Sequence, residues 1–167
     1  MEKENAYEYK EEVLEKYKKY NLIVHTNKEE EYKWLANEHV SIEVVNDSTT
    51  FFIDLEDEIT IYFDNSHRHF YYETRNDFEE AMKLVDALLN NEQCAVIIYS
   101  NDEWHGAGFD KACAIDEQNK VNYLKEFFNK ETYKEFVKTF KKYGVKIVLA
   151  FWDKTKTHEL IVDKGEF

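Results

Sequence analysis

Four short runs of β-branched and aromatic residues follow one another between Val40 and Glu73. Polar clusters of two or three residues separate them, such as Glu56-Asp57 and Asp64-Asn65-Ser66. Loops this short join antiparallel strands, because a parallel pair needs a crossover of a dozen or more residues. The block therefore predicts an antiparallel sheet. Its predicted strands are Val40 to Val45, Thr50 to Leu55, Glu58 to Phe63 and His67 to Glu73.

Helical periodicity flanks this block on both sides. Glu2 to Tyr20 places apolar residues at steps of three and four, which indicates one amphipathic helix. A second helix is expected after Asn76, a predicted N-cap whose capping box Glu79 completes. Between the first helix and the block, Leu22 to His25 has β character, and Lys28 to Asn37 predicts a helical turn.

The last ninety or so residues repeat a helix-then-hairpin pattern. Cys94 to Tyr99 predicts a buried strand that returns, after a loop at Asn101 to His105, as a second strand. Two further helices are expected before Gly144, a residue suited to a helix C-cap, and a final hairpin after it. The sequence thus predicts an α+β fold, with helices on one face of a mostly antiparallel sheet and helix-hairpin units in the C-terminal half.

A single domain is expected to span residues 1–167. The chain has no proline and four glycines, so no Pro/Gly/Ser-rich linker divides it. Its 167 residues also fall within the usual length of one domain. Cys94 and Cys113, the two cysteines, are expected to be buried thiols rather than a disulfide.

Charge is the strongest compositional signal. The chain carries 35 Asp and Glu against 22 Lys and Arg, a net −13. Such a field repels phosphate backbones and anionic lipids, which argues against direct binding of nucleic acid or membrane. It attracts a basic partner protein, although an acid excess also serves solubility alone. With no apolar run of membrane-spanning length and no secretory signal, the expected location is the cytoplasm.

Two acidic turns are the predicted partner-binding surface. Carboxylates cluster near Asp57, and a second group precedes Trp104 in an expected loop. An aromatic anchor with an acidic rim is the composition of a binding hot spot that receives a basic surface. Solvated loop charges, with Trp104 folded back on the sheet, would be the purely structural alternative. The predicted binding residues are Asp57, Glu58, Asp64, Asp102, Glu103, Trp104 and His105.

His67-Arg68-His69 suggests an alternative, enzymatic function. Residues two apart on a strand project to the same side, so His67 and His69 form half of a possible metal site or an acid–base pair. The sequence offers no patterned third ligand, no nucleophile elbow and no phosphate-binding loop. Gly106-Ala107-Gly108 lacks the third glycine of a dinucleotide fingerprint and is expected to relieve crowding. We therefore expect no cofactor.

The segment from Glu58 to about Asp110 resembles small bacterial immunity proteins of polymorphic and contact-dependent toxin systems. The likeness is carried by Glu58-Ile59-Thr60-Ile61-Tyr62-Phe63, His67-Arg68-His69-Phe70, a capped helix, Ala95-Val96-Ile97-Ile98-Tyr99 and Trp104-His105-Gly106-Ala107-Gly108. It covers about a third of the chain. The resemblance implies a cytosolic, non-catalytic inhibitor whose partner is a toxin domain. A further alternative is a DNA mimic that inhibits a nucleic-acid enzyme; the oligomeric state stays open.

Overall fold

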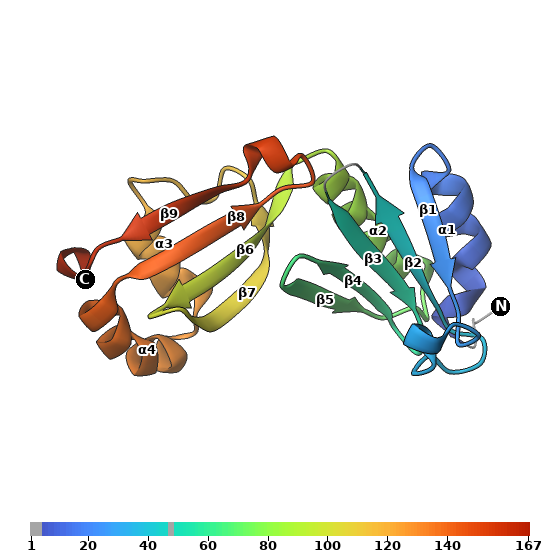
Figure 1. The fold of residues 1–167 in the computed structure, drawn as a ribbon, viewed down its shortest axis with the longest axis horizontal. Helices are drawn as coiled ribbons and strands as arrows, with labels where there is room; N and C mark the ends of the chain where they lie inside the picture. The colour runs from blue at the N-terminus through green and yellow to red at the C-terminus, as the bar shows by residue number, and fades with distance from the viewer. Residues whose placement is uncertain (1–4, 47–48) are drawn as a thin grey trace. The chain divides into compact units, whose positions relative to one another are not determined.

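The computed structural model describes residues 5–46 and 49–167 (Figure 1). The chain divides into two compact units, residues 1–90 and residues 91–167, called here the first and the second unit. Each unit contains one antiparallel sheet with helices on one of its faces. The α+β class and the antiparallel pairing are therefore confirmed, with the strands shared between two sheets. That residues 1–167 behave as one domain stays a prediction.

The sheet of the first unit is a meander of five strands, in which each strand pairs with the next along the chain. The short polar turns impose this order, since a tight turn returns the chain beside the strand it has just left. The strands are β1 (Asn21–His25), β2 (Val40–Val45), β3 (Thr50–Leu55), β4 (Ile59–Phe63) and β5 (Ser66–Phe70).

Two helices cover one face of this sheet (Figure 1). A 3-10 turn, η1 (Ala6–Tyr9), leads into α1 (Lys10–Tyr17), and α2 (Arg75–Leu89) follows the last strand. The hydroxyl of Tyr17 donates to Met82 O at 3.3 Å and to Asp86 Oδ1 at 3.0 Å, which ties α1 to α2. Alternate strand residues supply the opposing apolar layer. The buried ones include Val40, Ile42, Val44, Phe51, Ile53, Leu55, Ile59, Ile61 and Phe63.

The N-terminus of α2 lies two residues before the predicted one. Thr74 is the N-cap: its side chain accepts from Asp77 N, and the Asp77 carboxylate accepts from Thr74 N, which completes a capping box. Asn76 already belongs to the first turn, where its amide donates to Glu80. The predicted N-cap was wrong because Thr74 and Asn76 are both good caps, and only the extended backbone of Thr74 allows the bond.

The sheet of the second unit has the strand order β7-β6-β8-β9. Its strands are β6 (Gln93–Ser100), β7 (Glu103–Lys111), β8 (Val145–Ala150) and β9 (His158–Val162). Its helices are α3 (Lys120–Phe127) and α4 (Lys130–Tyr143), with 3-10 turns η3 (Lys154–Lys156) and η4 (Lys164–Glu166) near the C-terminus. Asn129 caps α4 by accepting from Glu131 N and Thr132 N, and this cap is the predicted break between the two helices.

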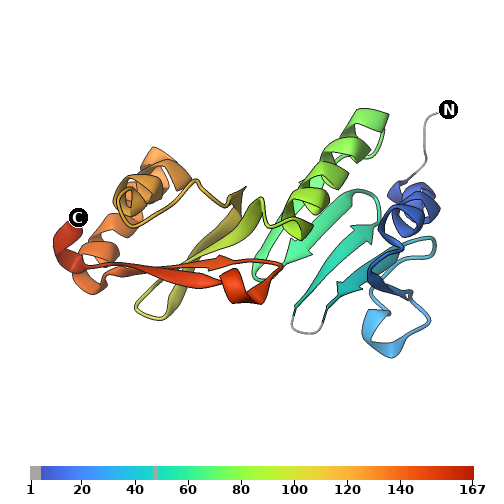
Figure 2. The same cartoon turned by 90° about the horizontal axis from the view of Figure 1, so that it is seen from above.

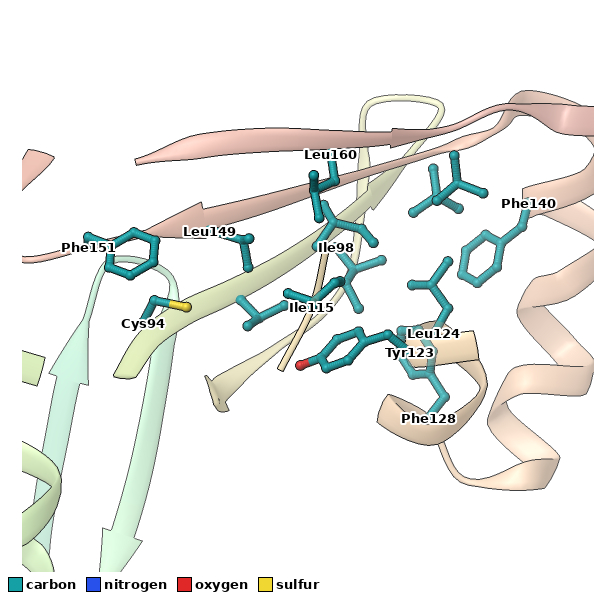
Figure 3. Close-up of a cluster of buried hydrophobic side chains, with 14 residues drawn as sticks. Cys94, Ile98, Ile115, Tyr123, Leu124, Phe128, Phe140, Leu149, Phe151 and Leu160 are labelled. Carbon is teal, nitrogen blue, oxygen red and sulfur yellow. The ribbon is translucent and has the colours of Figure 1, made fainter. Parts of the chain in front are cut away.

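The core of the second unit lies between α3, α4 and the sheet (Figure 3). Cys94 and Ile98 from β6 share it with Leu124 from α3 and Phe140 from α4. Gly144 ends α4 with a φ of 80°, which only glycine adopts without strain, and its N–H donates to Phe140 O. The buried thiol of Cys94 agrees with the expectation, whereas Cys113 is exposed.

Close approach of a helix explains the glycines of β7. A Cβ on Gly106 would lie 2.9 Å from Phe128 Cε1, whereas one on Gly108 would meet Phe127 at an ordinary 3.5 Å. The end of α3 therefore packs directly on the backbone of β7, and Gly106 is the position that permits it. Within the described residues, no helix combines the length and apolar character needed to cross a membrane.

Candidate functional site

A polar row crosses the face of the first sheet that the helices leave open. It consists of one residue from each strand, paired in register: His25, Ser41, Asp54, Thr60 and His69. Residues directly opposite on neighbouring strands project to the same face, so the five side chains form one line across the sheet. Four of them, all except His69, are buried polar side chains.

Hydrogen bonds join the members of the row in pairs. Ser41 Oγ donates to Asp54 Oδ1 at 2.5 Å, and Thr60 Oγ1 lies 3.1 Å from His69 Nδ1. The same His69 nitrogen lies 2.7 Å from Glu58 Oε1. Burial raises the pKa of Asp54 to about 6; the nearby Glu56 charge adds to the shift, and the Ser41 hydrogen bond opposes it. Asp54 therefore changes charge close to neutral pH.

The row opens at one end into a hollow of about 460 Å³. Two aromatic side chains line it and remain accessible: Trp34 is 59% exposed and Tyr62 is 38% exposed. Three carboxylates from the turn between β3 and β4 face the same space. The acidic hollow, as we call it, consists of Trp34, Glu56, Asp57, Glu58, Thr60, Tyr62 and His69.

The electrostatics of the two units differ sharply. Residues 1–90 contain 22 Asp and Glu against 10 Lys and Arg, a net −12. Residues 91–167 contain 13 against 12, a net −1. Almost all of the acidic excess thus belongs to the unit that carries the acidic hollow. Its field favours a positively charged ligand at this face.

Of the predicted binding residues in the first unit, Asp57 and Glu58 line the acidic hollow and Asp64 does not. Asp64 lies in the turn between β4 and β5, at the opposite end of β4. Its φ of 52° is left-handed, and its carboxylate accepts from Asn65 N at 2.8 Å. The structure gives Asp64 a role in shaping this turn, which a short polar side chain can perform in that conformation.

The predicted residues of the second unit lie on a different sheet. Asn101 and Asp102 alone form the turn between β6 and β7, each with positive φ, as in a type I′ hairpin. Glu103 opens β7, so the expected loop at residues 101–105 was wrong. Trp104, inside β7, pairs with Tyr99 on the face away from the helices and is 59% exposed.

His105 points to the other side of β7. The register shifts between Ile98 and Tyr99, which leaves His105 as the extra residue of a bulge. Its ring packs against Phe136 and Phe140, with centroids 4.8 Å and 5.4 Å away. His105 and Trp104 therefore do not share one surface. The acidic rim and the exposed tryptophan meet in the first unit, around Trp34.

The sequence predictions missed Trp34, because residues 28–37 carry only a weak helical signal. In the structure this segment contains one 3-10 turn, η2 (Glu30–Tyr32). A usable signal did exist in the strands: the polar residues Ser41, Asp54 and Thr60 interrupt runs of apolar residues. Buried polar side chains on neighbouring strands mark a face with its own hydrogen-bonded network.

The histidine pair has the predicted geometry. His67 and His69 lie on the open face of β5 with ring centroids 5.0 Å apart. His69 also contacts Glu58 and Thr60, while the ring centroids of His67 and Tyr62 lie 5.4 Å apart. In residues 5–46 and 49–167, no group of three or more His, Cys, Asp or Glu side chains is placed to hold a metal ion.

The acidic hollow is chemically suited to a cation that also has a flat or apolar part. Carboxylates accept charge-assisted hydrogen bonds from ammonium and guanidinium groups, and the faces of Trp and Tyr attract the same cations. Lysine and arginine side chains combine both properties. Comparison with known protein families, with curated proteins and with solved structures found no match for this chain.

Proposed function

We propose that this protein binds a basic partner protein through the acidic hollow and inhibits it, as an immunity protein inhibits its toxin. One observation carries the proposal: exposed Trp34 and Tyr62 border the same hollow as Glu56, Asp57 and Glu58. Binding energy at protein interfaces concentrates in a few aromatic anchors surrounded by polar groups. The acidic hollow has this composition, and the negative charge of its carboxylates favours a basic surface on the partner.

The charge of the first unit supports the same class of partner. A net −12 on residues 1–90 raises the association rate of a positively charged protein and weakens that of an anionic one. The effect is screened by salt, because the Debye length is only about 8 Å at physiological ionic strength. Association with the partner is therefore expected to slow as salt is added.

The likeness of residues 58–110 to immunity proteins supports inhibition as the outcome of binding. That segment begins at Glu58, inside the acidic hollow. Of the two alternatives, a DNA mimic needs carboxylates spaced along a surface like phosphates. Glu56, Asp57 and Glu58 instead gather in one turn beside aromatic rings, and we therefore favour a protein partner. The enzymatic alternative with His67 and His69 names no substrate.

The test is a pull-down from the native host at low and high salt, followed by an activity assay of the captured protein. We expect a basic protein whose activity the chain inhibits. Trp34→Ala is expected to weaken binding at least about 30-fold, since loss of a hot-spot aromatic costs about 2 kcal/mol or more. The affinity is measured by calorimetry.

Trp104→Ala is the matched control, because Trp104 has the same exposed fraction, 59%, and lies on the second unit. It is expected to leave the affinity within about twofold, as exposed substitutions outside an interface do. A partner that is acidic, or one whose activity continues in the complex, would contradict the proposed function. Equal losses with the two alanine variants would contradict the acidic hollow as its site.

A further inference from the structure

The segment between β1 and β2, residues 26–39, lies at the end of the first sheet where β1 stops and β2 begins, on the side away from α2 (Figure 2). The ring of Tyr32 stacks on that of His25, with centroids 4.0 Å apart and planes within 4°. The side chain of Leu35 is buried, and Asn27 Nδ2 donates to Asn37 Oδ1 at 2.9 Å. A compact loop whose ends lie together and whose own side chains fill it is an Ω-loop.

His25 holds the first end of this loop with both of its ring nitrogens. Nδ1 lies 2.7 Å from Glu29 Oε2 in the loop, and Nε2 lies 2.9 Å from Glu43 Oε2 on β2. Carboxylate oxygens only accept hydrogen bonds, so both ring nitrogens must carry a proton to donate. Only the charged imidazolium satisfies both contacts. The neutral ring would direct a lone pair at one carboxylate.

The two carboxylates are themselves fixed. Glu29 Oε1 accepts from Thr26 N at 2.9 Å, and Glu43 Oε1 accepts from Thr50 Oγ1 at 3.0 Å. Burial lowers the pKa of His25, but the hydrogen bonds and charges of Glu29 and Glu43 together outweigh it, and the net pKa is raised.

Two further side chains lie beside His25. Its cross-strand neighbour on β2 is Ser41, and Tyr32 covers its ring. Glu31 from the loop and Asp54 from β3 act on Tyr32 itself, raising its pKa together with Glu43 and Glu29, after burial. Of these carboxylates, Glu29 and Glu43 act on His25 itself, and their negative charges favour the imidazolium over the neutral ring.

A second histidine lies at the other end of the loop. His39 Nδ1 is 3.7 Å from Glu56 Oε2, and His39 Nε2 is 3.4 Å from Asp57 Oδ1. Both carboxylates belong to the acidic hollow. Trp34 lies between the two histidines in the sequence, so the loop that they hold is also the element that places Trp34 in the hollow.

We propose that residues 26–39 form a flap, that protonated His25 holds this flap closed on the sheet, and that loss of the His25 proton frees the flap and Trp34 with it. Its importance for partner binding rests on the proposed function. The flap itself is a property of the free chain. Because the folded state holds the proton more tightly, its stabilisation by His25 is complete below the ordinary histidine pKa and is lost as pH rises through the raised value.

The test uses amide hydrogen exchange and nuclear magnetic resonance on the free chain, over a pH series that begins below the ordinary histidine pKa and extends well above it. The exchange of residues 26–39, corrected for the intrinsic rate, is expected to rise with the His25 titration. Each pKa unit added by flap closure multiplies flap opening by about ten once the proton is lost. The Trp34 indole signal, assigned with Trp34→Phe, is expected to move with the same midpoint.

Two variants and a control make the result specific. Glu29→Gln keeps a hydrogen-bonding side chain but removes one charge, so the midpoint is expected to shift to lower pH. His25→Gln is expected to expose the flap at every pH and to remove the pH dependence. His67→Gln, on the same face of the sheet, is expected to change neither.

Exchange of residues 26–39 that is independent of pH, or a Trp34 signal with a different midpoint, would overturn the flap. If His25→Gln fails to fold, the wild-type and Glu29→Gln midpoints still decide the question. Since no partner takes part, failure of the flap leaves the proposed function standing, and failure to capture an inhibited partner leaves the flap standing.

Discussion

Residues 1–90 and residues 91–167 form the same kind of unit, an antiparallel sheet with helices on one face, but they differ in amino-acid composition. The first unit has a net charge of −12 and no glycine; the second has a net charge of −1 and all four glycines. Architecture therefore does not determine the surface. A unit of this kind can be strongly acidic because its core depends on the strand and helix patterns and not on its exposed residues.

Two of the glycines in the second unit have an identifiable structural reason. Gly106 admits Phe128 against the backbone of β7, and Gly144 ends α4 in a left-handed conformation. Both units also place side-chain-bearing residues in left-handed turns, Glu38 and Asp64 in the first unit and Asn91, Asn101 and Asp102 in the second. Asp suits that conformation because its side chain bonds locally, whereas Glu38 carries more strain. Helix packing, rather than turning, thus accounts for part of the glycine in the second unit.

The open faces of the two sheets differ as well. The first carries the row from His25 to His69 and the acidic hollow beside it. The second presents exposed Trp104, which pairs with Tyr99, and exposed Ile161 on β9. The residues that the proposed function uses lie on the open face of the first sheet, whereas the helix-covered faces contain buried apolar residues.

The substitution with the largest expected effect on stability tests whether the two units unfold independently. Phe140 is fully buried, so Phe140→Ala is expected to lower the free energy of unfolding by about 3–5 kcal/mol. If residues 1–167 form one domain, as the sequence predicts, hydrogen exchange should rise in both units together. Faster exchange confined to residues 91–167 would contradict the single domain and would make the comparison one between separate domains.

The second-largest expected effect on stability comes from Asp54 in the first unit. The pKa of Asp54, raised to about 6, means that its ionised form is disfavoured by folding, so this cost appears as pH rises from about 4 to about 6. Asp54→Asn is expected to stabilise the chain by up to about 3 kcal/mol at about pH 7 and to be neutral near pH 4. Chemical denaturation at the two pH values measures this. Exposed Asp57→Asn is the control, and a destabilising Asp54→Asn at neutral pH would contradict the assignment.

The smallest effect concerns the glycines. Gly106→Ala places a Cβ 2.9 Å from a ring atom of Phe128, and overpacking of this kind is expected to cost about 1–2 kcal/mol. Gly108→Ala meets its nearest neighbour at 3.5 Å and should cost less. Thermal unfolding of the two variants separates packing from a general dependence on glycine. Equal losses at both positions would show that Phe128 is not the reason for Gly106.

Local features of the fold were predictable to within a residue or two. The predicted strands Val40–Val45 and Thr50–Leu55 match residue for residue, and the break at Asn129 is the N-cap of α4. Trp104 was placed wrongly because a two-residue turn at Asn101 and Asp102 leaves no loop for it. A type I′ turn depends on positive φ at both residues, and neither of these residues is a glycine that would have signalled it.

Sequence by itself determined the antiparallel strands, the helices and the acidity, because periodicity, turn chemistry and charge are properties of neighbouring residues. Only the tertiary structure decided that the strands form two sheets, and that the acidic turn near Asp57 lies beside Trp34 instead of Trp104. Both outcomes depend on segments distant in sequence. Residues 26–39 fold back on the sheet because Leu35 is buried there and His25 hydrogen-bonds to Glu43 on β2. Such contacts join residues far apart in sequence, so no local sequence pattern indicates them.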